Sequence, residues 1–228
     1  MNPQAHLWEW PQRLANAWWE LAFHPSAYIH PDQVVHRLGA HWPWQAGPVS
    51  SRTVARQLNL TPVGLVDWST PQLRAALLPL EVLKDWSLLL AATHEAPALA
   101  RVIRQSDLQA LQPALGLDDW AWAIALRESA GAEPDWATAG QPLPVSNWAE
   151  RLHQQALRLL GQWMAQLPES LSQRLALKWP PGALPRAAST DRGMSPPHAV
   201  WRAAYERVVN RWDPTWESDW SLALALRS

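Results

Sequence analysis

The stretch FHPSAYIHP, residues 23–31, decides how the N-terminal part of the chain folds. Its two prolines, Pro25 and Pro31, fix φ, lack a backbone donor and bias the residue before each of them away from helix. We therefore expect His24 and His30 to be extended or turn residues, with one short turn between them. Such a segment forms a rigid elbow, which closes one helix, opens the next at Pro31 and directs Tyr28 through the backbone.

Helical patterns lie on both sides of this elbow. Apolar residues recur at helical spacing after typical helix starts. The helix at 79–94 is apolar almost all round, so we expect it at the centre of a bundle. The pattern predicts an all-α fold, an irregular multi-helix bundle in a single domain. The other predicted helices cover 3–22, 31–38, 50–58 (capped by Ser50 or Ser51), 70–78 (capped by Thr70), 119–130 (capped by Asp118), 147–167 (capped by Asn147) and 168–177, with further starts at Pro97, Ser106 and Ser195.

Composition suggests how the chain is divided. No break in charge or composition interrupts residues 1–178, which we expect to form a helical core domain. Residues 179–195 are rich in proline and small polar residues, so we predict a mobile linker. Residues 196–228 should form a C-terminal helix and a tail that packs on the core. A short strand at 63–66 would lack a partner, and we do not include it in the fold.

Charge and composition exclude several classes of protein. The 228 residues are 48% hydrophobic and 17% charged, enough to bury a core. The formal net charge of −1 provides no basic field for nucleic acid. The absence of cysteine rules out disulfides and thiolate metal sites. The N-terminus lacks the pattern of a signal peptide, and the apolar runs are too short to span a bilayer, so we expect a cytoplasmic protein.

No cofactor or enzyme motif is found in the sequence. Five of the eight histidines lie within the first 41 residues, but their spacing does not match that of zinc ligands on a helix. The chain has no phosphate-binding loop and no nucleophile elbow. We interpret Asp118 as a helix cap and Glu217 with Asp219 as a solvated tail. We therefore expect no catalytic residue, no metal and no cofactor. The five histidines are His6, His24, His30, His36 and His41.

Eighteen tryptophans are unusual for a chain of this length. Several lie in or beside predicted loops, where they would either form an exposed partner site or cover helix ends as lids. The segment Trp42-Pro43-Trp44 is the candidate for protein binding, because a proline next to two tryptophans reduces the entropy lost on docking. The other loop tryptophans are Trp136, Trp179, Trp212, Trp216 and Trp220.

The elbow also carries a family resemblance. Phe23, Pro25, Tyr28, Ile29 and His30, followed by Gln33 and Val34, resemble the Phe-x-Pro-x-x-Tyr-[Ile/Leu]-His motif of the K-type sorting-platform proteins of bacterial type III secretion systems, the SctK family. Residues 174–180, RLALKWP, are similar to the C-terminal Leu-x-Leu-x-x-Pro stretch of that family. About fifteen residues match, and nothing aligns between residues 45 and 145.

The resemblance implies a non-enzymatic cytoplasmic adaptor. Such a protein would lie beneath the inner membrane, linking the cytoplasmic domain of the inner-membrane ring protein to the cytosolic pods, without catalysis, cofactor, nucleic acid or membrane insertion. Two alternatives remain open at this point. One is a helical chaperone or regulator that binds a partner helix in a groove, and the other is an enzyme whose site the sequence does not reveal.

Overall fold

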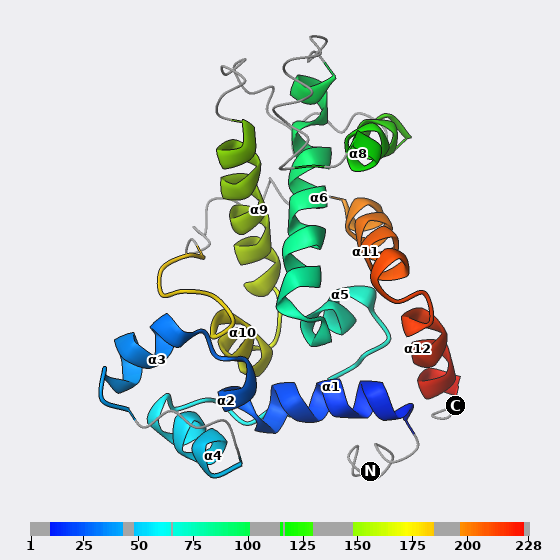
Figure 1. Cartoon of the computed structure of the whole chain (residues 1–228). Helices are drawn as coiled ribbons and strands as arrows, with labels where there is room; N and C mark the ends of the chain where they lie inside the picture. The colour runs from blue at the N-terminus through cyan, green and yellow to red at the C-terminus, as the bar shows by residue number, and fades with distance from the viewer. Residues whose placement is uncertain are drawn as a thin grey trace. The chain divides into compact units, whose positions relative to one another are not determined.

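The computed structural model describes residues 10–42, 48–64, 66–100, 115, 117–129, 148–184 and 197–225. All regular secondary structure in these ranges is helical: eleven α-helices and one 3-10 helix. The all-α multi-helix prediction is therefore confirmed (Figure 1). Residues 61–64, part of the weak strand candidate, are irregular.

The chain divides into two compact units, each assembled from segments that are distant in sequence. Unit 1 comprises residues 1–80, 164–184 and 209–228, and unit 2 comprises residues 81–163 and 185–208. The predicted boundaries at 178 and 195 do not coincide with this division. Each unit has its own buried aromatic cluster.

Unit 1 begins with α1 (Gln12–Phe23), the elbow helix α2 (Pro25–Tyr28) and α3 (Pro31–Leu38). The carbonyl of Pro11 accepts the first helical bonds of α1, from the amides of Leu14 and Ala15. His24 and His30 lie between the helices, with His30 extended at φ −63° and ψ 136°. Gly39 ends α3 at φ 95°, a conformation that a residue with a side chain rarely adopts. The two prolines therefore divide this segment as expected.

Helix α4 (Pro48–Gln57) packs against α2. Ser51 was predicted as a possible N-cap, but it lies inside α4 with its side chain buried. Its hydroxyl lies 2.6 Å from the hydroxyl of Ser26 in the elbow. The helix starts earlier than predicted because Pro48 provides a favourable first position. Ser51 therefore contributes to the contact between α4 and α2 instead of capping α4.

Three further short helices belong to unit 1. Helix α5 (Pro71–Arg74) continues into the 3-10 helix η2 (Ala75–Leu77), where one α-helix was predicted. Thr70 precedes Pro71 as expected, but its side chain makes no cap bond. The backbone carbonyl of Thr70 accepts the amides of Leu73 and Arg74 instead. Helix α10 (Glu169–Ala176) follows Pro168 and ends two residues before the buried Lys178.

The C-terminal segment of unit 1 carries α12 (Trp216–Ala225). Trp220 is fully buried, with its ring 5.3 Å from Trp10 and 5.8 Å from Trp68, centroid to centroid. Trp216 is also buried and contacts Trp220. Trp179 is buried as well, whereas Trp212 is 41% exposed. Three of the predicted loop tryptophans are therefore core residues rather than parts of an exposed partner site, and two of them, Trp216 and Trp220, lie within a helix.

Unit 2 is organised around α6 (Leu80–Leu99), which lies beside α9 (Trp148–Met164) in Figure 1. Trp86 of α6 is 1% exposed. Its ring lies 5.0 Å from Trp163 and 5.2 Å from Trp201, and Tyr205 also contacts it. Trp201 and Tyr205 belong to α11 (His198–Trp212). The apolar helix predicted to be central thus forms the core of this unit.

Pro97 was expected to start a new helix, but it lies inside the last turn of α6. The helix continues because the missing amide removes a single bond near its end, and the amide of Ala100 still donates to Ala96. Helix α8 (Leu117–Ser129) contains Asp118 rather than being capped by it. Arg207 of α11 donates to Asp119 at 2.9 Å and lies over the ring of Trp122.

Several predictions fall outside the described residues. These are the first turns at 3–9, the start at Ser106, the caps at Asn147 and Ser195, Trp44, Trp136, and most of the proposed linker, since residues 185–196 are not described. No helix among the described residues is both long enough and apolar enough to cross a membrane.

Alanine variants of Trp220 and Trp212 should differ in stability, because one ring is buried in the core and the other is partly exposed. We expect Trp220→Ala to lower the free energy of unfolding by about 3–5 kcal/mol, because it empties a site among three other indole rings. Trp212→Ala should cost less, about 1–2 kcal/mol, because that ring is already 41% exposed. Urea unfolding followed by circular dichroism measures both. Equal losses from the two variants would contradict the assignment of the C-terminal helix to the core.

Candidate functional site

The elbow and the end of α10 form one hydrogen-bonded junction, although about 150 residues separate them. The backbone amide of His30 donates to the carbonyl of Leu177 at 2.7 Å. The side-chain amide of Gln33 donates to the carbonyl of Trp179 at 2.9 Å. Ile29 and Leu177 belong to the same buried apolar cluster, together with Val34 and Val54. The two segments that carry the family resemblance are therefore in direct contact.

The local sequence explains this junction. A helix leaves its last carbonyls without intrahelical partners, and α10 ends at Ala176. The amide of His30 has no partner in α3, because it precedes the first turn of that helix. The amide of His30 and the carbonyl of Leu177 therefore provide each other with a hydrogen-bond partner. His30 also caps α3, since its Nδ1 accepts the amide of Asp32 at 3.2 Å.

Arg174 connects the same region to α1. The Arg174 side chain is buried, and its Nε donates to the carbonyl of Ala22 at 3.3 Å. Its Nη1 donates to the carbonyls of Ser170 and Thr61. Three backbone carbonyls from three segments therefore share one guanidinium, which ties the end of α1 and the segment at Thr61 to α10.

The predicted motif residues have different environments. Pro25 is buried, Tyr28 and His30 are half-buried, and Pro31 is exposed as the first residue of α3. The hydroxyl of Tyr28 donates to the carbonyl of Leu21 at 2.8 Å, which ties the elbow back to α1. Burial raises the pKa of the Tyr28 phenol well above its usual value, although the nearby Arg174 opposes this shift. The tyrosine thus acts as a neutral hydrogen-bond donor.

Phe23 is 42% exposed, unlike the buried Pro25 and the half-buried Tyr28 and His30. Its ring lies 4.5 Å from that of Trp19, which is 53% exposed. The two residues stand four positions apart on α1, so their side chains share one face. We call Trp19 and Phe23 the α1 aromatic pair. Sequence analysis did not select Trp19, although its i,i+4 spacing from Phe23 was visible.

Trp42, the first residue of the predicted protein-binding segment, is half-buried. It packs against the cluster of Ile29, Val34, Val54 and Leu177. Pro43 and Trp44 lie outside the described residues. The binding role of this segment stays a prediction, and the packing of Trp42 gives it a structural role as well.

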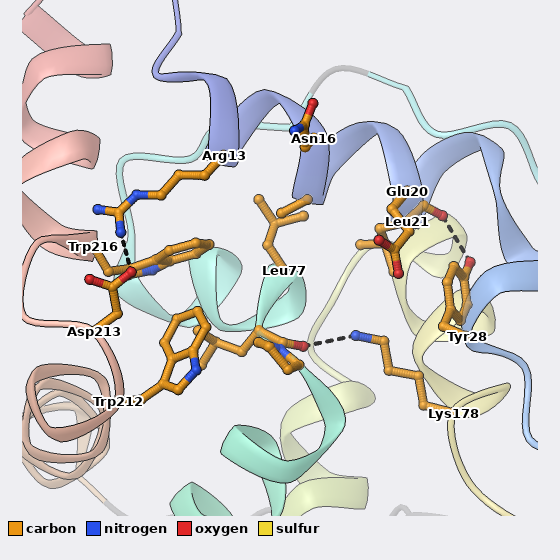
Figure 2. A pocket seen from close by; sticks show the side chains of 13 residues that line it. Arg13, Asn16, Glu20, Leu21, Tyr28, Leu77, Lys178, Trp212, Asp213 and Trp216 are labelled. Atoms are coloured by element: carbon orange, nitrogen blue, oxygen red, sulfur yellow. Dashed lines mark hydrogen bonds and ion pairs between the residues drawn. The ribbon is translucent and has the colours of Figure 1, made fainter.

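Next to the junction, unit 1 contains a hollow of about 440 Å³. Figure 2 shows its lining side chains, which come from α1, the elbow, the end of η2, the segment after α10, and the α11–α12 connection. Most of the wall is apolar or aromatic. The lining residues are Arg13, Asn16, Ala17, Glu20, Leu21, Tyr28, Leu77, Leu78, Pro79, Lys178, Trp212, Asp213 and Trp216.

Lys178 is the buried charged residue of this hollow, with 7% of its surface exposed. Its Nζ donates to the carbonyl of Leu78 at 2.9 Å and lies 5.7 Å from the centre of the Tyr28 ring. Among the described residues, no carboxylate forms an ion pair with it. Burial lowers the pKa of Lys178 to about 8, and the negative charge of Glu20 only partly opposes this shift. Sequence analysis gave Lys178 no role. The available signal for its burial was its position between Leu177 and Trp179 in the sequence.

The acidic residues of the C-terminal tail are paired rather than solvated, which corrects the sequence interpretation. Arg13 forms ion pairs with both Asp213 and Asp219. Glu217 pairs with the buried Arg74 at 2.6 Å. Arg13 and Arg74 lie more than 140 residues away from these carboxylates in the sequence, so the sequence alone does not reveal the pairing. These pairs join α12 to α1 and α5.

Unit 2 holds a buried polar cluster of its own. Glu95 pairs with Arg151 at 2.5 Å and lies 3.3 Å from Nδ1 of His94. Burial acts to raise the pKa of Glu95, but the hydrogen bonds from His94 and Arg151 outweigh it and hold the pKa below its usual value. The described residues contain no group of three or more His, Cys, Asp or Glu residues that could hold a metal ion.

Comparisons of the chain with protein-family models, with curated proteins and with solved structures find no match.

The contacts of Tyr28 predict that it anchors the elbow. Tyr28→Ala should lower the free energy of unfolding by about 2–4 kcal/mol, through lost aromatic packing. Tyr28→Phe should cost only about 0.5–1.5 kcal/mol, because it removes just the hydrogen bond to Leu21. Denaturant unfolding of both variants checks this order. An unchanged stability of Tyr28→Ala would show that the ring is not an anchor.

The depressed pKa of Lys178 predicts a pH dependence of stability. Between about pH 8 and the ordinary lysine pKa of about 10.4, the unfolded chain binds a proton that the folded protein lacks. Stability therefore rises with pH in this window and falls as the pH drops towards the folded pKa. From pH 7.5 to 9.5 the gain due to Lys178 should be about 2 kcal/mol.

Lys178→Met provides the matched control for this dependence, because the buried stem remains while the titrating group is lost. The free energy of unfolding of each protein is measured at several pH values by urea titration. The difference between the two should grow with pH. A difference that stays constant from pH 7.5 to 9.5 would mean that Lys178 titrates as an ordinary lysine.

Proposed function

We propose that this protein is a non-enzymatic cytoplasmic adaptor of a bacterial type III secretion sorting platform. It would link the cytoplasmic domain of the inner-membrane ring protein to the cytosolic pods. Its partners are proteins, and it needs neither cofactor nor nucleic acid. It works at the periphery of the inner-membrane secretion complex.

One observation carries this proposal: the two segments that resemble the SctK family pack on each other. The motif around residues 23–30 and the stretch at 174–180 share the His30–Leu177 hydrogen bond and one apolar cluster. Two chance resemblances would have no reason to meet in the fold. Their contact supports the interpretation that both belong to one family-like structural element.

The surface of unit 1 offers a way to bind a protein. The α1 aromatic pair, Trp19 and Phe23, exposes two neighbouring rings on the helix that leads into the elbow. Aromatic side chains are enriched at the energetic centres of protein interfaces. Both rings pack against the buried Trp18, whose ring centroid lies 5.3 Å from that of Phe23 and 6.5 Å from that of Trp19. A pair held in this way loses little entropy on docking, so we assign the contact with the ring protein to this face.

The test of this function is recruitment in the bacterium that carries the chain. Tagged wild-type protein should co-purify with the ring and pod proteins of the secretion system. Trp19→Ala with Phe23→Ala should reduce recovery of the ring protein at least about tenfold while leaving the unfolding temperature nearly unchanged, as expected for an aromatic hot spot worth more than about 1.4 kcal/mol. Val35→Ala with Leu222→Ala is the matched control, because these apolar side chains are each 55% exposed.

The double variant Trp42→Ala with Trp44→Ala compares the segment predicted from sequence with the α1 aromatic pair. If the segment is the contact, recruitment is lost without loss of helicity. Unfolding of this variant would assign the tryptophans to the core. Failure of the wild-type protein to associate with any secretion component would reject the adaptor function itself, whereas normal recruitment of the α1 variant would reject only the assigned face.

A further inference from the structure

We propose that Lys178 is a carbonyl-reactive amine, which captures aldehydes with an apolar body in the hollow of unit 1. The site combines an open volume of about 440 Å³ with a buried amine in its wall. This reactivity does not depend on the adaptor function.

The surroundings of the amine are suited to such a ligand. Leu21, Leu77 and the indoles of Trp212 and Trp216 provide apolar and aromatic wall. Nζ of Lys178 donates to the carbonyl of Leu78, and this is its single hydrogen bond among the described residues. Figure 2 marks the bond with the dashed line that starts at Lys178. An ammonium has three donors, so this one contact satisfies a third of its capacity. The amine is thus held in place by one protein acceptor and by the ring of Tyr28.

The other charges of the hollow do not neutralise the amine directly. Arg13 and Asp213 are paired with each other. Glu20 lines the hollow but is exposed, and it forms no ion pair with Lys178. A buried ammonium without an ionic partner is unfavourable, and loss of its proton removes that cost. The same loss exposes the nitrogen lone pair.

The reaction joins this nitrogen to the carbonyl carbon of the ligand. The lone pair of the neutral amine attacks the carbon, and a C–N bond forms. The carbonyl oxygen then leaves as water with the two hydrogens of the amine, and a C=N double bond remains. No oxidant or reductant takes part, and hydrolysis reverses the step. Lysine amines form this kind of adduct when desolvation keeps them neutral.

The pKa sets the expected selectivity. At pH 7.4 a pKa of about 8 leaves roughly one-fifth of Lys178 neutral, against about 0.1% for a lysine of ordinary pKa. Lower basicity also reduces nucleophilicity, by roughly tenfold if the Brønsted slope known for thiols applies. The net advantage is on the order of tenfold.

The chain offers an internal reference, because Lys84 is the single other lysine. Its side chain is 51% exposed and pairs with Glu81. The full-length protein is treated at pH 7.4 with benzaldehyde and cyanoborohydride, which reduces the C=N bond and traps the adduct. Peptide mass spectrometry then follows Lys178, Lys84 and the N-terminal amine separately. Lys178 should be labelled about tenfold faster than Lys84.

Two further arms test the fold and the hollow. In denaturant the two lysines should react at similar rates, because the selectivity comes from burial. Trp212→Ala removes an aromatic wall residue that is 41% exposed, and it should reduce the preference of Lys178 for benzaldehyde over acetaldehyde by at least about threefold. Asn16→Trp, at another exposed lining position, should slow benzaldehyde labelling by filling the hollow. Circular dichroism establishes that both variants fold.

The proposal has clear contrary outcomes. If Lys178 is labelled no faster than Lys84, the amine is not unusually reactive and only donates a hydrogen bond to Leu78. If Lys178 still reacts faster than Lys84 in denaturant, the selectivity comes from the local sequence and not from burial in the fold. An unchanged aldehyde preference in folded Trp212→Ala, together with unchanged benzaldehyde labelling of folded Asn16→Trp, would show that the ligand does not occupy the hollow.

Discussion

Unit 1 depends on the hydrogen bond between the amide of His30 and the carbonyl of Leu177. The amide lies just ahead of Pro31, outside the helical ladder, and the carbonyl lies just past the end of α10. Buried backbone groups without partners are costly, so each needs the other. Ile29 and Leu177 add apolar contact at the same place. This junction brings the N-terminal elbow and a segment 150 residues later into one structure.

The same junction places the remaining parts of the site. Tyr28 returns from the elbow to α1 through Leu21, and Lys178 follows Leu177 and reaches Leu78. The hollow lies among these segments, and α12 closes its far wall through Trp216. The exposed rings of Trp19 and Phe23 stand on the helix that the elbow terminates. The elbow therefore positions the face proposed for protein binding and the amine proposed to capture aldehydes.

Local signals predicted much of this fold. Two prolines defined the elbow, and the apolar helix around Trp86 was placed at a core from its pattern. Signals that depend on distant partners were missed. Ser51 looked like a helix cap until its contact with Ser26 was known. Glu217 and Asp219 looked solvated because Arg74 and Arg13 lie far away in sequence. Lys178 carried no motif, since its character comes from burial among segments that only the fold brings together.

The protection of the His30 amide from hydrogen exchange tests the central claim most directly. Residue-resolved NMR on the intact protein gives its exchange rate under native conditions. If the junction organises unit 1, this amide should open only with the unit as a whole and rank among the slowest in it. Exchange of the His30 amide at the rate of an exposed loop, while amides in the middle of α1 stay protected, would contradict the account.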